Sequence, residues 1–199
     1  MRRPTAQGFH LVELVVTAAV AALALLVAAP PLARAATQFE LRLAAGEVAG
    51  SLRQARAYAI RHAAHVGLKF RTSAEGTVYW ALYRDGDGDG VRTADLAAGI
   101  DPPVAPPRAF AHFGRRVRFG FPPGQAPTDP SDPRRRLDRL DDPVRFNRSD
   151  IASFSPLDGA TPGSIYLTDG ARHLVCVRVD SRSGRPRILT WLPEERQWR

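Results

Sequence analysis

The stretch GFHLVEL at residues 8–14 decides the fold. It closes a short basic leader, MRRPTAQG at residues 1–8, and opens an apolar run in which Glu13 is the only charged residue up to Ala29. A charge inside a membrane segment costs about 2.5–3.5 kcal/mol on insertion scales, so this carboxylate indicates a function and a partner. Arg2 and Arg3 in the leader favour the cytoplasmic side. We therefore expect one membrane-spanning helix with its N-terminus inside.

The order G-F-x-L-x-E before an apolar helix resembles the class III signal of type IV pilins and type II secretion pseudopilins. The resemblance implies that a prepilin peptidase cuts between Gly8 and Phe9 and N-methylates Phe9, so that Glu13 becomes the fifth mature residue. The new α-amino group and the Glu13 carboxylate then lie one helical turn apart. They can neutralise each other within one chain or between subunits of a filament, which gives Glu13 a role in assembly.

An ordinary secretory signal is the alternative for the same region, because a basic start, an apolar core and Ala33-Arg34-Ala35 form its usual three parts. That interpretation predicts a soluble secreted binding protein starting near Ala36. Glu13 argues against it, since an ordinary apolar core has no use for a carboxylate. We favour the pilin-type signal, which predicts a single-pass inner-membrane protein with its C-terminal domain in the periplasm.

Two periodicities follow the membrane run. Apolar residues at alternating intervals of four and three predict one buried face of a helix that runs to about Ala63. Short β-type runs separated by turn residues then predict strands, and the proline-rich stretch 122–143 is expected to be an exposed loop. The helical stripe consists of Leu41, Ala45, Val48, Leu52, Ala55 and Ala59, and the strand candidates are 65–71, 77–84, 116–121, 151–155, 164–168, 172–179 and 186–192.

The predicted fold class is α+β, with a long N-terminal transmembrane and amphipathic helix packed on an antiparallel β-sheet or β-sandwich, as in pilins. We expect a cleaved leader at 1–8, a transmembrane part of the helix at 9–30, a periplasmic part at 31–63 and a β-rich globular domain at 64–199. Cys176 is the only cysteine. It excludes an internal disulfide, and we expect it to be a core residue of a strand.

The C-terminal half carries a second resemblance. The stretches FSPLDGATPGSIYL at 154–167 and RHLVCVRVDSRSGRPR at 172–187 resemble the general secretion pathway H / FimT family of minor pseudopilins and minor pilins. Members end in a hairpin with a Gly-Arg-x-Arg turn, matched here from Gly184 to Arg187. The resemblance implies either a minor pseudopilin of a type II secretion system, which we favour, or a FimT-like minor type IV pilin that binds DNA for uptake. Both assemble with other pilin-type subunits in a filament.

The arginines of this hairpin are the residues that the DNA-binding role would use. Arg182, Arg185 and Arg187 surround the turn, and arginine forks suit phosphate oxygens. The alternative is a solvated turn whose charges do no more than keep it soluble, and we favour it because charge clusters usually have no further role.

The stretch DGDGDGVRTAD at 85–95 is a candidate calcium loop. Asp85, Asp87 and Asp89 occupy alternate positions before a glycine, the carbonyl of Val91 would be the backbone ligand, and Asp95 would close the site. The twelfth position is Leu96 rather than glutamate, so the alternatives are a weak calcium site and a flexible acidic turn. We expect no other cofactor.

Catalytic motifs are absent from the sequence. It has no H-E-x-x-H, no G-x-S-x-G, no P-loop and no Cys/His cluster. The histidines are scattered at His10, His62, His65, His112 and His173. The sequence therefore predicts a structural protein and not an enzyme.

Overall fold

The computed structural model describes residues 11–75, 77–110, 117–157 and 159–199. Gly8 and Phe9, the predicted cleavage site, lie outside these ranges, as do His10 and His112. The chain forms two compact units, one before Gln38 and one from Gln38 to Arg199, which we describe separately.

The first unit contains the beginning of helix α1, which spans Leu11–His62. Side chains from Leu11 to Ala29 are all exposed, and most of them are apolar. By length and composition, α1 contains a segment able to cross a membrane. This agrees with the expected single-pass anchor.

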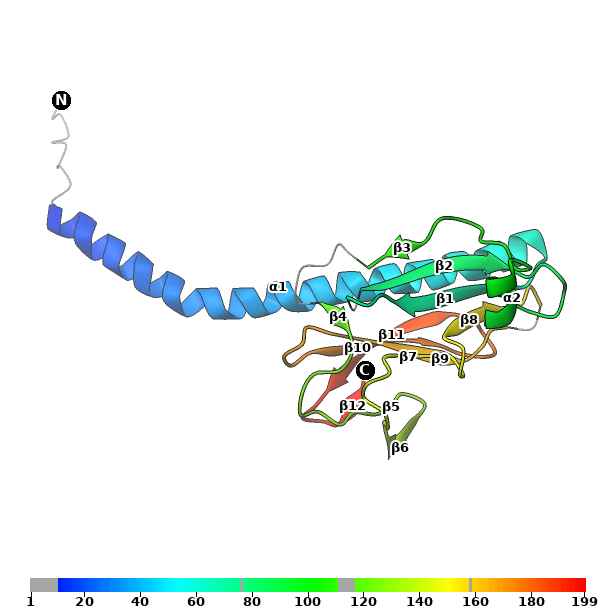
Figure 1. Ribbon diagram of the computed structural model, residues 1–199. Coiled ribbons are helices and arrows are strands. Elements are labelled where there is room, and N and C mark those ends of the chain that lie inside the picture. Colours follow the sequence, from blue (N-terminus) through cyan, green and yellow to red (C-terminus); the bar gives the residue numbers. More distant parts are fainter. Residues whose placement is uncertain (1–10, 76, 111–116, 158) are drawn as a thin grey trace, which may run out of the picture. The chain divides into compact units, whose positions relative to one another are not determined.

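The second unit contains the rest of α1, a short helix α2 and strands β1 to β12 (Figure 1). All strand pairs among the described residues are antiparallel. One sheet has the order β3-β2-β1-β8, and a second has the order β12-β11-β10-β9-β4, with β7 also paired to β9. Strands β5 and β6 pair only with each other. The bounds are α2 Thr93–Ala98, β1 Val66–Thr72, β2 Val78–Arg84, β3 Arg108–Ala109, β4 Arg118–Phe119, β5 Thr128–Asp129, β6 Asp132–Arg136, β7 Val144–Arg145, β8 Ile151–Phe154, β9 Gly163–Thr168, β10 Leu174–Val179, β11 Pro186–Leu192 and β12 Gln197–Trp198.

The main core lies between α1 and both sheets. All six residues of the predicted helical stripe are buried, and they pack with strand residues such as Phe70, Trp80 and Val177. A smaller cluster on the second sheet contains Tyr166, Leu174, Cys176 and Trp191. Cys176 is fully buried in β10, as predicted for a core residue, and burial raises the pKa of its thiol to about 12. The α+β prediction, with a long helix on antiparallel sheets, is confirmed.

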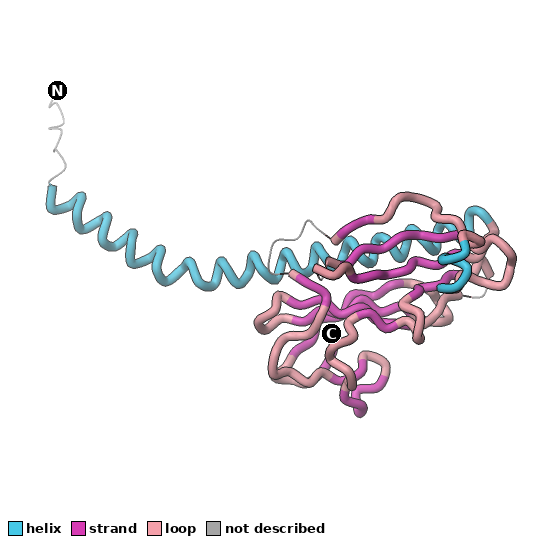
Figure 2. Tube along the Cα trace, viewed as in Figure 1, coloured by secondary structure: helices cyan, strands magenta, loops and turns pink. Residues whose placement is uncertain are grey.

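The proline-rich stretch differs from the loop expected there. It contains the β5–β6 hairpin, and Figure 2 separates its strands, in magenta, from the connecting loops, in pink. Among the contacts that attach it to the domain, Trp198 Nε1 donates to the Thr128 carbonyl at 2.7 Å, and Gln125 Nε2 donates to the Arg172 carbonyl at 2.8 Å. Within this hairpin, β6 is exposed along its whole length, whereas Thr128 in β5 is buried.

Candidate functional site

Glu13 lies in the first turn of α1 with its side chain exposed. Within the first unit, Thr17 Oγ1 satisfies its own hydrogen bond by donating to the Leu14 carbonyl at 3.0 Å. Glu13 is therefore the one charged group in an otherwise apolar stretch that runs to Ala29. Its expected partner, the α-amino group of Phe9, lies outside the described residues.

In the second unit, α1 carries an apolar stripe that the domain does not cover. Phe39, Leu43 and Ile60 are 63%, 49% and 54% exposed. Between them come Gly46 and Gly50, where an added Cβ would meet nothing within 4 Å. From Phe39 to Gly50 the spacing of four and three repeats that of the buried stripe on the opposite side of the helix, and Ile60 extends the same side further along. This outer stripe was missed in the sequence, although its period was visible there.

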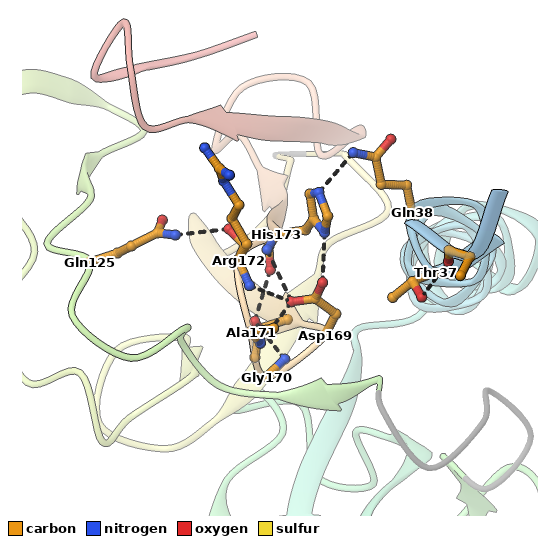
Figure 3. A network of polar contacts seen from close by, with 10 residues as sticks. Thr37, Gln38, Gln125, Asp169, Gly170, Ala171, Arg172 and His173 are labelled. Carbon is orange, nitrogen blue, oxygen red and sulfur yellow. Dashed lines mark hydrogen bonds and ion pairs between the residues drawn. The ribbon is translucent and has the colours of Figure 1, made fainter. Parts of the chain in front are cut away.

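A polar network joins the start of this part of α1 to the β9–β10 turn (Figure 3). One carboxylate oxygen of Asp169 accepts the N–H groups of Ala171, Arg172 and His173 at 2.9, 2.9 and 3.0 Å. The other oxygen lies 2.6 Å from His173 Nδ1, and His173 Nε2 lies 2.8 Å from Gln38 Nε2. This pattern assigns the proton to Nδ1, so that Nε2 accepts from the Gln38 amide.

The same network explains the acidity of Asp169. Its side chain is only 5% exposed, and burial alone would raise its pKa. The backbone N–H donors and His173 more than offset that cost, so the pKa of Asp169 lies below the ordinary value. A cavity of about 330 Å³ borders His173 and Gln38, with Leu41, Val175 and Trp191 among its walls. The arrangement fastens α1 to the second sheet, a structural role that scattered histidines in the sequence did not predict.

The acidic loop brings together three of the five predicted calcium ligands. Carboxylate oxygens of Asp85, Asp87 and Asp89 lie within 4.8 Å of one another. Asp95 is outside this group and belongs to α2. Val91 is buried, and its side chain fills the space beside Gly67. The structure thus gathers the alternating carboxylates but does not add Asp95 to them.

These carboxylates already have partners within the loop. Asp85 accepts the N–H groups of Gly88 and Gly90 at 2.7 and 3.0 Å, while Asp89 pairs with Arg92. Partial burial alone would raise the pKa of Asp85, but hydrogen bonds from the backbone outweigh it and lower the pKa. The loop therefore stabilises the ionised Asp85 without a cation.

Asp101 holds the acidic loop from outside. It is 1% exposed, and its two carboxylate oxygens accept the N–H groups of Gly86 at 3.0 Å and Arg92 at 3.2 Å. The backbone must come close here, because a Cβ at Gly86 would lie 2.0 Å from the Ile100 carbonyl oxygen. Asp101 was not singled out in the sequence.

The hairpin arginines divide into two groups. Arg187 lies 3.6 Å from the Asp180 carboxylate, which is also 3.7 Å from Arg178. Arg182 and Arg185 are exposed, and neither has a carboxylate within 4 Å among the described residues. The three arginines of the sequence motif therefore do not form one uniform positive patch.

Two further arginines join this hairpin from α1. Arg53 and Arg56 line a cavity of about 400 Å³ with Ala57, Ile60, Arg185 and Pro186. Arg56 packs on the turn so closely that a Cβ at Gly184 would lie 3.2 Å from its Nε. We call this cavity the arginine cleft. The sequence reasoning missed it because the arginines come from segments far apart in the chain.

Comparison with known proteins identifies the family. The family model described as type II transport protein GspH matches residues 44–184, which run from the buried half of α1 to the turn before β11. Neither the curated proteins nor the solved structures contain a match. Members of the matching family are structural pseudopilins, not enzymes, and associate with other pseudopilins in a filament. The match covers well over half of the chain, which therefore belongs to the GspH family as a GspH/FimT-like minor pseudopilin.

Proposed function

We propose that this chain is a minor subunit of a type II secretion pseudopilus used for protein export. Its first unit would anchor it in the inner membrane, and its second unit would lie in the periplasm. The observation that carries this proposal is the membrane-length apolar stretch of α1 with a single charge, Glu13, in a chain of the GspH family. A subunit of this kind needs an anchor before assembly and a helix able to pack on other helices after it.

Processing is part of the same proposal. The prepilin peptidase would cut between Gly8 and Phe9 and methylate Phe9, leaving an amine one helical turn from Glu13. In an apolar bundle of helices, an uncompensated carboxylate or amine is costly, whereas the pair costs much less. Glu13 would therefore favour the one position of the subunit in the filament at which its carboxylate lies next to an N-terminal amine.

The outer stripe of α1 supports helix packing in the filament. Its exposed Phe39, Leu43 and Ile60 offer apolar area, and the open surface at Gly46 and Gly50 lets another helix approach closely. An apolar stripe that stays exposed on a domain with a buried apolar core indicates an interaction surface.

Glu13→Val tests this function, with Thr17→Val as the matched control in the same segment. We expect Glu13→Val to insert into the membrane at least as well as the wild type, because a buried charge is removed. Its incorporation into sheared filaments should fall several-fold, while Thr17→Val should incorporate normally. Mass spectrometry should find a methylated Phe9 at the mature N-terminus. Normal incorporation of Glu13→Val would show that Glu13 has no pairing role. A mature chain starting at Ala36 would contradict the pseudopilin function.

DNA binding by a FimT-like pilin is the second candidate. The exposed Arg182 and Arg185, with no carboxylate nearby among the described residues, favour it. Asp180 between Arg178 and Arg187 counts against it, because this carboxylate repels phosphate. Affinity for duplex DNA of any sequence that falls steeply with salt would support this candidate.

A further inference from the structure

Strand β11 has an open edge beside the arginine cleft. Thr190 exchanges two main-chain hydrogen bonds with Arg199, at 2.7 and 3.0 Å, so its N–H and C=O groups point towards β12. Main-chain groups alternate in direction along a strand, and β11 pairs with β10 in an unbroken register. The N–H and C=O of Ile188 therefore point the same way as those of Thr190. Strand β12 and the adjoining Arg199 pair with β11 at Leu192, Trp191 and Thr190, so among the described residues no strand covers Ile188 on this side.

The walls of the cleft next to this edge are apolar. Ile188 is paired with Val177, whose side chain lies in the core under α1, so Ile188 faces α1 as well. It is 41% exposed, and Ile60 on α1 is 54% exposed. Ala57, Ile60 and Pro186 are the apolar residues that line the cleft itself, and Ile188 lies two residues beyond Pro186 along β11. An extended chain entering here would bury apolar side chains between the helix and the strand.

The rim of the cleft is positive and lacks counterions. Some arginines elsewhere on the domain have acidic partners, as Arg187 has Asp180 and Arg172 has Glu194 at 3.3 Å. Among the described residues, no carboxylate lies within 4.0 Å of the guanidinium groups of Arg53, Arg56 or Arg185. Three unpaired guanidinium groups around one cavity favour carboxylates in the partner.

We propose that the arginine cleft binds an extended acidic segment of a neighbouring pilin-type subunit, which adds to β11 as an edge strand at Ile188. Main-chain hydrogen bonds at Ile188 would align the segment, and its carboxylates would meet Arg53, Arg56 and Arg185. Pro186 offers no N–H, so the added pairing is short and the arginines supply much of the affinity. This inference rests on the proposed filament role.

A nucleic acid fits this surface less well. Open main-chain donors and acceptors on a strand match another polypeptide backbone, and apolar walls match its side chains. A phosphate backbone would use only the arginines and would leave the open main-chain groups of Ile188 without a partner. DNA is therefore an alternative outcome for the experiment.

The experiment measures binding of a fluorescent peptide of alternating glutamate and valine to the full chain in detergent. A peptide with lysine in place of glutamate and a single-stranded oligodeoxynucleotide serve as comparison probes. We expect the glutamate peptide to bind, the lysine peptide not to bind, and the oligonucleotide to bind more weakly than the glutamate peptide. Binding should weaken as salt is raised, because the rim is exposed.

Matched variants separate the cleft from general positive charge. The triple variant Arg53→Gln, Arg56→Gln and Arg185→Gln should weaken peptide binding by about tenfold or more. The control removes the same charge from the exposed strand β6, by Arg134→Gln, Arg135→Gln and Arg136→Gln, and should leave binding unchanged. Ile188→Pro removes the edge N–H and should also weaken binding by about tenfold. Ile188→Asp keeps that N–H but adds a repulsive charge, so it tests the same edge if Ile188→Pro does not fold.

Three results would overturn the proposal. Equal losses of peptide affinity in the cleft variant and in the β6 control would indicate that binding depends on the general positive charge of the domain and not on the cleft. Tighter binding of the oligonucleotide, lost in the cleft variant but unaffected by Ile188→Pro and Ile188→Asp, would indicate a nucleic-acid surface. Absence of peptide binding up to about 1 mM would exclude strand addition. Because the assay needs no filament, these failures differ from failure of the filament role, which Glu13→Val reports.

Discussion

Two charged turns in the same domain differ in whether their charged side chains have partners within the fold. In the acidic turn after β2, Asp85 and Asp101 accept backbone N–H groups and Asp89 pairs with Arg92. In the basic turn before β11, Arg182 and Arg185 are exposed without a carboxylate within 4 Å among the described residues. Backbone N–H groups can satisfy a carboxylate locally, whereas a guanidinium needs an acceptor that its own turn rarely provides. Charge clusters that look equivalent in the sequence therefore differ in what they leave available to a partner.

The largest effect is expected at Asp101, which holds the acidic turn together. Asp101→Ala removes a buried carboxylate and leaves the N–H groups of Gly86 and Arg92 without their acceptor in two partly buried hydrogen bonds. We expect the free energy of unfolding to fall by about 3 kcal/mol, measured by denaturant titration of the detergent-solubilised chain with tryptophan fluorescence. Asp87→Ala is the control, since Asp87 accepts only one long hydrogen bond, 3.3 Å from the Asp89 N–H, and it should cost less than about 0.5 kcal/mol. Equal costs would mean that the turn does not depend on its buried carboxylate.

The basic turn should be more sensitive to its glycine than the acidic turn. Gly184 has φ of 57°, and a Cβ there would lie 3.2 Å from Arg56 Nε. Gly88 has φ of 91°, with nothing within 4 Å of an added Cβ. A positive φ at an alanine should lower the free energy of unfolding of both variants by about 1–2 kcal/mol, but only Gly184→Ala must also displace Arg56. We expect Gly184→Ala to lower the midpoint of unfolding more than Gly88→Ala, and the reverse order would contradict the contact between Arg56 and the turn.

The pH dependence should differ between the two turns. Backbone hydrogen bonds that outweigh partial burial lower the folded pKa of Asp85, so its stabilising contribution is complete above the unfolded value, about 3.9, and is lost as the pH falls through the lower folded value. The difference in unfolding free energy between wild type and Asp85→Asn should therefore be constant near neutral pH and shrink below about pH 4. Arg182→Gln should show no such change, because the guanidinium stays protonated throughout. A constant difference down to the lowest pH would show that the hydrogen bonds do not favour the ionised form of Asp85.

The sequence predicted what depends on local period and missed what depends on distant partners. The stripe from Leu41 to Ala59 and the core position of Cys176 follow from helical and strand spacing alone, and both are buried as predicted. The arginine cleft does not, because it requires α1 and the β10–β11 turn to meet. The β5–β6 hairpin was missed for a similar reason: its place is fixed by tertiary contacts such as the one between Trp198 and the Thr128 carbonyl.

The smallest effect concerns calcium at the acidic turn. The three clustered carboxylates favour a cation, but their existing partners and the separate position of Asp95 predict a weak site. Extracellular-type sites bind at about 10⁻⁴–10⁻³ M, and calcium at a concentration equal to its Kd stabilises the folded state by only about 0.4 kcal/mol. We expect calcium at a few times that concentration to raise the melting temperature of the full chain slightly, magnesium to do less, and Asp87→Ala to abolish the rise without changing the melting temperature in chelator. Identical melting temperatures with calcium and with chelator would make the loop an acidic turn that needs only its own backbone, and would sharpen the contrast with the open arginine cleft.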